Sequence, residues 1–401
     1  MIHIKGLNQK SNKETNRSSV LKFIRRYKDC SRSDISRAMG LERATITNII
    51  NDLIKWELIV ESRFIKGKDG RRSIGLKLSE KYGVVGVRLS RHYFSIGLFS
   101  LNGKQYLTKN YPIKIFENAE IVLSRLEKSI RSFLIENSNV KILGIGIALP
   151  GPFLKYEGRI ALMSEFPGWE KISLENELKL LFNIPIHLEH DAKAGAFAEW
   201  NQRSHALGET MVYIAAGQGI GAGIIIDGKI FAGSLGIAGE IGHMSINFNG
   251  QKCSCNNHGC LEQYCSTISL ERQARKEIKD YPDSLLNQNC DFLSIVDAYK
   301  NNDKFAISLF LHSAKFLSIA IANIVNIINP DLIVLGDEMS MFGEDLLYSV
   351  KKGLKKLILP ILYKKLNIEL SKIKSNPELI GASDLIVDKV LSKPSKLKKM
   401  L

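Results

Sequence analysis

The chain has 401 residues, with 56 Lys and Arg against 41 Asp and Glu and a formal net charge of +15. This length corresponds to two or three domains of roughly 150 residues each. The charge is uneven, because residues 1–82 contain 19 basic and 9 acidic residues, a net +10, whereas the other 319 residues carry +5. The composition therefore excludes a uniformly basic body. It predicts a basic N-terminal module, suited to a polyanionic partner, on a nearly neutral body.

Neither end of the sequence predicts export or membrane insertion. The first residues, MIHIKGLNQKSNKETNR, lack the apolar core of a signal peptide. No run of about 18 or more apolar residues is present. We therefore expect a cytoplasmic protein without membrane insertion. The basic tail, SKPSKLKKML, is expected to be solvated.

The first 81 residues predict three helices followed by two strands. A frayed start is expected to precede the first helix at Asn16, and the second helix is expected between a capping box at Ser31 and a turn at Gly40. The third is expected from Glu42. Helical spacing places these apolar residues on the buried faces: Val20, Ile24, Tyr27, Ile35, Ala38, Met39, Ile46, Ile49, Ile50 and Leu53.

Two strands, 58–60 and 74–78, follow the third helix and are joined by a basic segment. This order is typical of a winged helix-turn-helix domain. On that interpretation the polar face of the third helix enters the major groove of operator DNA, and the wing contacts the minor groove or the backbone. The expected DNA contacts are Arg43, Thr47, Asn48, Arg71 and Arg72. The alternative is a plain helical packing module with a solvated basic loop.

From Tyr82 onward, strands alternate with helices. Strands are expected at 84–89, 93–99 and 142–148, and helices at 118–136, 268–279, 305–326 and 344–357. Such alternation predicts an α/β body, which we expect to form two lobes.

Four potential metal ligands lie close together in the sequence. His243, Cys253, Cys255 and Cys260 form the pattern H-x9-C-x-C-x4-C. Three thiolates and an imidazole are a common structural Zn²⁺ set, and they leave no coordination position open for catalysis. The alternative is a chance cluster of reduced cysteines. His258 could compete for the metal but is expected to be exposed, and Cys265 is expected to be buried.

Two carboxylates are interleaved with these ligands. Glu240 precedes His243 by three residues, and Glu262 follows Cys260 by two. A loop folded around a metal would bring both toward one cleft, where carboxylates could accept hydrogen bonds from the hydroxyls of a sugar. Spacing alone equally allows both to cap local turns.

These motifs together resemble the ROK family of sugar kinases and repressors. The resemblance rests on Gly-Glu-Ile-Gly-His at 239–243 with the cysteine pattern, and on Leu-Pro-Gly-Pro at 149–152, Pro-Gly-Trp at 167–169, His-Asp-Ala at 190–192, Gly-Gln-Gly-Ile-Gly at 217–221 and Asn-Pro-Asp at 329–331. With the N-terminal module, the whole chain is similar to the xylose-type and N-acetylglucosamine-type repressors of that family. The resemblance implies an actin-like, sugar-kinase two-lobe fold with a sugar between the lobes.

The resemblance also implies roles for individual residues. Glu240, His243 and Glu262 would contact the sugar, and His243 would also bind the zinc ion. Asp191 stands at the position of the family's general base, and His190 replaces the Asn that usually precedes it. Asn256 replaces a usual Gly of the cysteine loop and can adopt its left-handed conformation.

The sequence departs from the kinases at the nucleotide. Arg88-Leu89-Ser90-Arg91-His92 replaces the Asp-x-Gly-x-Thr phosphate loop, Gln218 replaces a Thr, and Asp337 replaces a glycine. Arginine cannot hold the water shell of Mg²⁺, and the glycines that let backbone amides approach phosphate are lost. We therefore expect no phosphoryl transfer.

The sequence as a whole predicts a zinc-stabilised, sugar-responsive repressor that binds operator DNA as a homodimer or homotetramer. We expect residues 1–81 to form the DNA-binding domain, 82–190 the first lobe and 191–401 the second, with the last helix returning to the first lobe. The alternatives are a sugar kinase that also binds DNA, and a body that docks another protein in place of a sugar.

Overall fold

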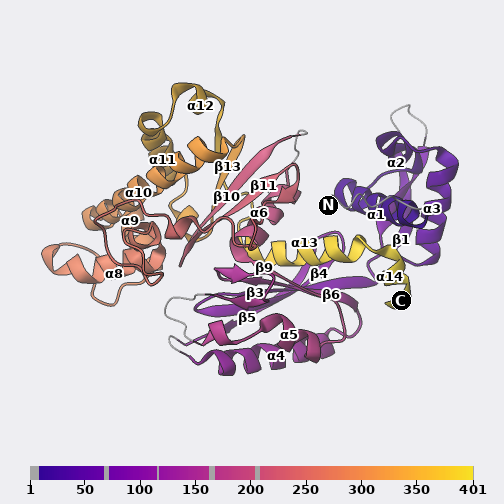
Figure 1. Cartoon of the computed structure of the whole chain (residues 1–401), viewed down its shortest axis with the longest axis horizontal. Helices are drawn as coiled ribbons and strands as arrows, with labels where there is room; N and C mark the ends of the chain where they lie inside the picture. Colours follow the sequence, from indigo (N-terminus) through magenta and orange to yellow (C-terminus); the bar gives the residue numbers. More distant parts are fainter. Residues whose placement is uncertain (1–8, 67–71, 115–116, 162–167, 204–207, 401) are drawn as a thin grey trace, which may run out of the picture.

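The computed structural model describes residues 9–66, 72–114, 117–161, 168–203 and 208–400. Figure 1 shows two α/β lobes, with the N-terminal helices placed beside the end of the first. This arrangement agrees with the predicted fold class.

The N-terminal elements occur in the predicted order. They are α1 (Gln9–Tyr27), α2 (Arg32–Met39), α3 (Arg43–Lys55) and the antiparallel pair β1 (Ile59–Lys66) and β2 (Arg72–Leu78). The capping box at Ser31 is formed, and Gly40 ends α2 with a φ of 64°. All four apolar residues predicted for α3 are buried.

Three expectations for this region were wrong. Helix α1 begins at Gln9, so the segment before Asn16 is partly helical. Tyr27 is 57% exposed, and Leu21 fills the buried face in its place. Ala38 is also exposed, because α2 is short and only Ile35 points fully into the core.

The first lobe is built on a mixed sheet with the strand order β5-β4-β3-β6-β9. Helices α4 and α5 supply its other large elements, and apolar residues of α4, α5 and the sheet form one core. The elements of this lobe are β3 (Tyr82–Leu89), β4 (Tyr93–Ser100), β5 (Gln105–Pro112), α4 (Ala119–Glu136), β6 (Lys141–Leu149), β7 (Phe153–Leu154), β8 (Arg159–Ile160), η1 (Trp169–Lys171), α5 (Leu174–Leu181) and β9 (Ile186–His190).

The second lobe has a related sheet with the order β12-β11-β10-β13-β14. Its elements are α6 (Asp191–Asn201), β10 (Thr210–Ala216), β11 (Ile220–Ile226), β12 (Lys229–Ile230), η2 (Ile241–His243), α7 (Glu262–Cys265), α8 (Thr267–Glu277), η3 (Ile278–Asp280), α9 (Phe292–Lys300), α10 (Lys304–Ile328), β13 (Leu332–Gly336), η4 (Glu338–Phe342), α11 (Glu344–Leu357), α12 (Pro360–Lys365) and β14 (Asn367–Leu370).

Helix α10 is long and apolar enough, by length and composition alone, to cross a membrane. In this fold 61% of its most apolar window is buried. Most of its apolar residues between Phe305 and Val325 belong to the core of the second lobe, together with residues of β10, β11 and α11, whereas Leu311 is 53% exposed. Core helices of globular proteins commonly have this character.

Helix α13 (Pro377–Leu391) lies between the lobes and contacts β3, β6 and β9 on one side and α6 on the other. It is followed by α14 (Pro394–Met400), which contacts α1. The expectation of a solvated tail was therefore wrong in part. Leu397 is 2% exposed and belongs to the core of the N-terminal domain, although Lys396 and Lys398 are exposed.

Close backbone contacts fix α13 in this position. A Cβ on Gly146 of β6 would lie 1.9 Å from the carbonyl oxygen of Ala382, and a Cβ on Gly381 would lie 1.8 Å from that of Ala194 in α6. Backbone atoms cannot rotate away as a side chain does. The three elements can therefore approach this closely only because glycine occupies both positions.

We predict that Gly381→Ala lowers the free energy of unfolding by about 1–3 kcal/mol, the usual cost of overpacking. Alanine favours a helix over glycine by about 1 kcal/mol, but this gain is smaller than the cost of displacing α6. The matched control is Gly219→Ala, where the nearest atom to the new Cβ is the end of Arg91 at 3.4 Å. Urea unfolding measures both, and equal stability of the two variants would contradict the packing argument.

Candidate functional site

A cleft between the lobes brings together most of the polar residues that the sequence singled out. Its empty space, open solvent included, is about 690 Å³. Its lining includes the predicted sugar-binding residues His190, Asp191, Glu240, His243 and Glu262, and the altered nucleotide-site residues Arg88, Ser90, Arg91, Gln218 and Asp337.

His190 and Asp191 reach the cleft because one strand ends and one helix begins there. His190 is the last residue of β9, and Asp191 is the first of α6. Their side chains are close, with 3.4 Å between His190 Nε2 and Asp191 Oδ1. A Cβ on Gly151 would lie 2.2 Å from the same imidazole nitrogen, so this loop can pass the ring only with glycine.

Glu240, His243 and Glu262 converge from the loops around η2 and α7. His243 Nδ1 lies 3.6 Å from Glu262 Oε1, and His190 Nε2 lies 3.8 Å from Glu240 Oε1. These separations exceed hydrogen-bond length, so the two carboxylates and the two imidazoles are not hydrogen-bonded to each other. The structure therefore places both carboxylates in the cleft, where they remain able to accept hydrogen bonds from a ligand.

Several buried polar atoms of the cleft have no hydrogen-bond partner among the described residues. They include His190 Nδ1, Glu240 Oε1 and Gln218 Oε1. Leaving such an atom unsatisfied costs about 1–3 kcal/mol. A polyhydroxylated ligand supplies donors and acceptors for such groups, so the cleft is chemically suited to a sugar.

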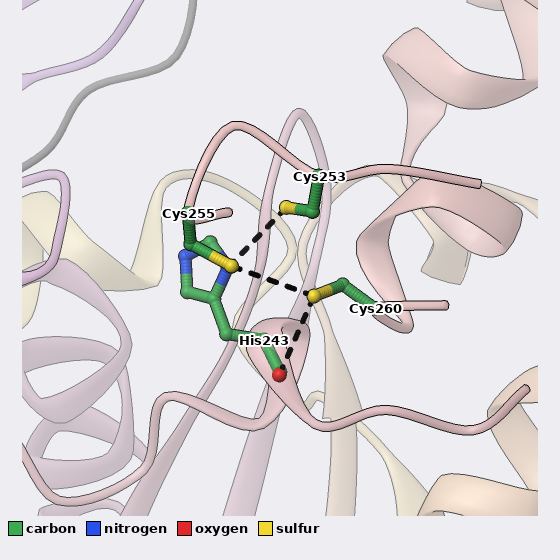
Figure 2. A group of neighbouring side chains, drawn as sticks. All are labelled: His243, Cys253, Cys255 and Cys260. Atoms are coloured by element: carbon green, nitrogen blue, oxygen red, sulfur yellow. Dashed lines mark hydrogen bonds between the residues drawn. The ribbon is translucent and has the colours of Figure 1, made fainter. Parts of the chain in front are cut away.

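The predicted metal ligands come together beside this cleft. The ligand atoms of His243, Cys253, Cys255 and Cys260 all lie within 4.8 Å of one another (Figure 2). The sulfur atoms of Cys255 and Cys260 are 3.6 Å apart. Two sulfurs on a tetrahedral zinc ion with bonds of about 2.3 Å would be roughly 3.8 Å apart. These residues therefore fit a closed structural Zn²⁺ site, as predicted.

Backbone geometry allows the cysteine loop to fold back on itself. Asn256 has a φ of 70°, the left-handed conformation expected for it, and its N–H donates to the carbonyl of Cys253 at 3.0 Å. Gly259 has a φ of 69°, and a Cβ there would lie 1.8 Å from the carbonyl oxygen of Asn247. His258 is exposed and Cys265 is buried, both as expected.

The metal site and the sugar residues share a contact. The thiol of Cys253 lies 3.3 Å from Glu262 Oε1, and His243 belongs to both sets. A metal that fixes the cysteine loop would therefore also fix two of the groups that face the cleft.

Arg88 lines the cleft beside Asp337 and is only 8% exposed. Its Nη1 is 2.9 Å from Glu378 Oε2, and its Nη2 is 3.4 Å from Asp337 Oδ2. It also donates to the hydroxyl of Tyr93 at 3.1 Å and to Asn376 at 3.3 Å. A positive charge therefore stands where the kinase motif has an aspartate.

Burial and the neighbouring charges shift the pKa values of this group in opposite directions. Burial lowers the pKa of Arg88, but the attraction of Glu378 and Asp337 outweighs burial and raises it overall. Burial raises the pKa of Glu378 to about 8, against the opposing effect of Arg88. Burial and the charge of Asp337 raise the pKa of Glu338 to about 7. This end of the cleft is thus lined by a cluster of paired basic and acidic side chains.

Sequence reasoning missed Glu378 and Tyr213, whose hydroxyl donates to Glu378 at 3.0 Å. Both side chains are completely buried. The sequence offers little signal, because Glu378 is one of four charged residues in this helix, with Asp384, Asp388 and Lys389. Nothing in the sequence pairs that residue with Arg88, which is 290 positions earlier.

The predicted DNA contacts form a separate surface. Arg43, Asn48 and Arg72 are exposed, and Thr47 is half-buried with its hydroxyl bonded to the carbonyl of Arg43. Arg71 lies outside the described residues. A hollow beside this surface is lined by Ser31, Arg32, Ser33, Arg43, Thr47, Ser73 and Ile74.

We predict that Cys255→Ser abolishes stoichiometric zinc binding, because three ligands hold the ion far less tightly than four. Metal content by mass spectrometry and thermal stability should both fall. Cys265→Ala is the control, because this thiol is buried outside the cluster, and it should keep one zinc ion per chain. A Cys255→Ser protein with native zinc content and stability would contradict the assignment.

Comparison with known proteins places this geometry in a family. A model of the ROK family matches residues 84–389. The chain is 33% identical to a xylose repressor of Caldicellulosiruptor bescii over 397 residues, which is 95% of this chain and 98% of that one. It is 29% identical to the DNA-binding transcriptional dual regulator NagC of Escherichia coli strain K12 over 346 residues, 84% of each chain.

Solved structures of ROK family proteins have a similar fold. A ROK family transcriptional regulator, described as a homologue of the E. coli MLC protein, has a TM-score of 0.81 at 26% identity and covers 97% of this chain and 99% of its own. A ROK family glucokinase from Streptomyces griseus, solved with glucose and AMPPNP, covers 76% of this chain and 98% of its own, with a TM-score of 0.68 and 21% identity. The latter likeness concerns the fold alone. The chain belongs to the ROK family, and its body has the family's actin-like two-lobe fold.

Proposed function

We propose that this protein is a sugar-responsive, DNA-binding transcriptional repressor of a carbohydrate-utilisation operon. The observation that carries the proposal is the asymmetry of the cleft. Its sugar end presents carboxylates and imidazoles to the cleft, whereas the end expected to hold a nucleotide is lined by Arg88 and Asp337, which form an ion pair in place of the expected phosphate loop. The relatives named as repressors extend over almost the whole chain, including the N-terminal helices, and support this function over that of a kinase.

In this proposal the sugar lies against His190, Asp191, Glu240, His243 and Glu262. Carboxylates accept hydrogen bonds from adjacent hydroxyls, and each imidazole can donate or accept one. Asp191 binds a hydroxyl without deprotonating it for transfer, because the stretch around Arg88 lacks the aspartate and glycine that would hold a phosphoryl donor. D-Xylose is the first candidate, since two of the similar proteins are named xylose repressors.

Residues 1–81 serve as the DNA-binding domain, and 82–190 and 191–401 as the two lobes. Helix α3 presents Arg43, Thr47 and Asn48 to the major groove, while Arg71 and Arg72 of the wing reach the adjoining groove or backbone. The net +10 of residues 1–82 supports binding to the phosphates. A homodimer or homotetramer would place two such units on the half-sites of a palindrome, in the cytoplasm.

We predict that Arg43→Ala weakens DNA binding by about 1–3 kcal/mol, the usual contribution of an arginine that reads a base edge. DNA selected by the native protein from a random duplex pool serves as the target in fluorescence anisotropy. Lys352→Ala, an exposed lysine of α11, is the control and should bind as the native protein does. The proposed interface is wrong if both variants lose affinity equally or if neither does.

We predict that Asp191→Ala lowers sugar affinity about 10-fold or more, because it removes a hydrogen bond to a charged acceptor. In a thermal-shift screen of D-xylose, D-glucose and N-acetylglucosamine, a sugar at about 100 times its Kd stabilises the native protein by roughly 2.7 kcal/mol. Asp283→Ala, an exposed acid, is the control. Sugar phosphate formed from ATP and Mg²⁺ would favour the kinase alternative and overturn the proposal.

A further inference from the structure

Two helices begin at the cleft and run away from it side by side. Asp191, which lines the cleft, is the first residue of α6. Glu378, in the first turn of α13, pairs with Arg88, which also lines the cleft. A ligand or a structural change in the cleft can therefore act on the first turn of both helices.

The two helices are packed too tightly to move independently. A Cβ on Gly381 of α13 would overlap the carbonyl of Ala194 in α6, and a Cβ on Gly195 of α6 would lie 3.3 Å from Glu378 Oε1. Backbones that approach this closely resist sliding past each other, because interiors are close-packed and only slightly compressible. A shift at the cleft end of one helix therefore acts on the other through these contacts.

The end of α6 and the middle of α13 meet at one buried carboxylate. Asn201, the last residue of α6, donates to Asp384 Oδ2 of α13 at 3.1 Å. Asp384 Oδ1 accepts a hydrogen bond from Arg25 of α1, and Arg25 Nε donates to the carbonyl of Leu101 at 3.0 Å. The side chains of Arg25 and Asp384 are 14% and 7% exposed.

This junction lies inside a continuous apolar core. Val20, Leu21 and Ile24 of α1 belong to the same cluster as Val387 and Val390 of α13 and the core residues of α3. In Figure 1, α13 (yellow) runs from the centre of the molecule to α14, beside the N-terminal helices. The N-terminal domain is therefore attached to the body by packing as well as by the chain.

We infer that the Arg25–Asp384 pair is the joint through which the state of the cleft reaches the DNA-binding helices. This inference rests on the proposed function and assigns positioning roles to Arg25, Asp384 and Asn201. Sugar contacts at Asp191 shift α6, and changes at Arg88 shift α13. Asp384 receives both movements and passes them to α1.

A second ion pair joins the same two helices and provides a matched control. Lys22 of α1 lies 2.7 Å from Asp388 of α13, but both side chains are 40% exposed. Exposed pairs contribute little and are screened by salt, whereas removing one partner of a buried pair has a large effect. Coupling should therefore depend on Asp384 and hardly on Asp388.

The test compares DNA affinity with and without D-xylose for the full native chain and for the variants Asp388→Asn, Asp384→Asn and Asn201→Ala. We expect D-xylose to weaken DNA binding of the native protein and of Asp388→Asn by about 10-fold or more, within the usual range of allosteric coupling. Asp384→Asn, which keeps the shape of the side chain, should still bind D-xylose in a thermal-shift assay. Its DNA affinity should change by less than about 2-fold with the sugar.

A folded Asp384→Asn protein with the native ratio of affinities would overturn the inference. Circular dichroism and thermal unfolding establish whether this variant folds. If it does not, Asn201→Ala decides, because it removes the link to α6 and leaves the ion pair in place. An unchanged ratio in Asn201→Ala would then overturn the inference, and a reduced ratio would support it.

A second comparison, which needs no sugar, distinguishes a wrong joint from a wrong effector. Should D-xylose leave native DNA affinity unchanged, the effector assignment is wrong, and Glu378→Gln takes the place of the sugar as the perturbation of the cleft. We expect it to change DNA affinity at least about 5-fold in the native background and less than 2-fold with Asp384→Asn. The inference is overturned if Glu378→Gln leaves DNA affinity unchanged in the native background, or if it changes DNA affinity equally in both backgrounds.

Discussion

The buried guanidinium group of Arg88 joins three parts of the fold that are far apart in the sequence. It lies on β3 of the first lobe and contacts Asp337, which follows β13 of the second lobe, and Glu378 at the start of α13. A buried charge is tolerated only when its partners surround it, so the lobes and α13 are held in one relation around this group.

The opposite end of the cleft depends on a different constraint. Glu262 and His243 are positioned by a loop whose own fold depends on four metal ligands and on backbone that only glycine or asparagine adopts easily. Rigid placement matters because a sugar offers many similar hydroxyls, and recognition needs donors and acceptors at fixed positions. A metal ion held by these four ligands would thus stabilise the loop that places Glu262 and His243 in the cleft.

Much of this organisation could be predicted from the sequence, and the limits are physical. The helix that begins at Ser31, the Cys3His set and the left-handed Asn256 depend on neighbours within about twenty residues, so their patterns are visible along the chain. The pairing of Arg88 with Glu378, and of Arg25 with Asp384, depends on how distant elements dock. No local periodicity encodes such contacts, and Tyr27 shows that even a helical face can turn to solvent at its end.

The position of α13 and α14 has a consequence for the order in which the protein is made. Glu14 in α1 accepts hydrogen bonds from Ser395, 381 residues later, and Leu397 completes the core around Val20 and Ile24. The ribosome adds roughly 5–20 residues per second, so residues 1–81 wait on the order of 20–60 s for these partners. The first domain to emerge is thus the last to be completed, and a chain that ends before residue 377 lacks part of the core against which α3 packs.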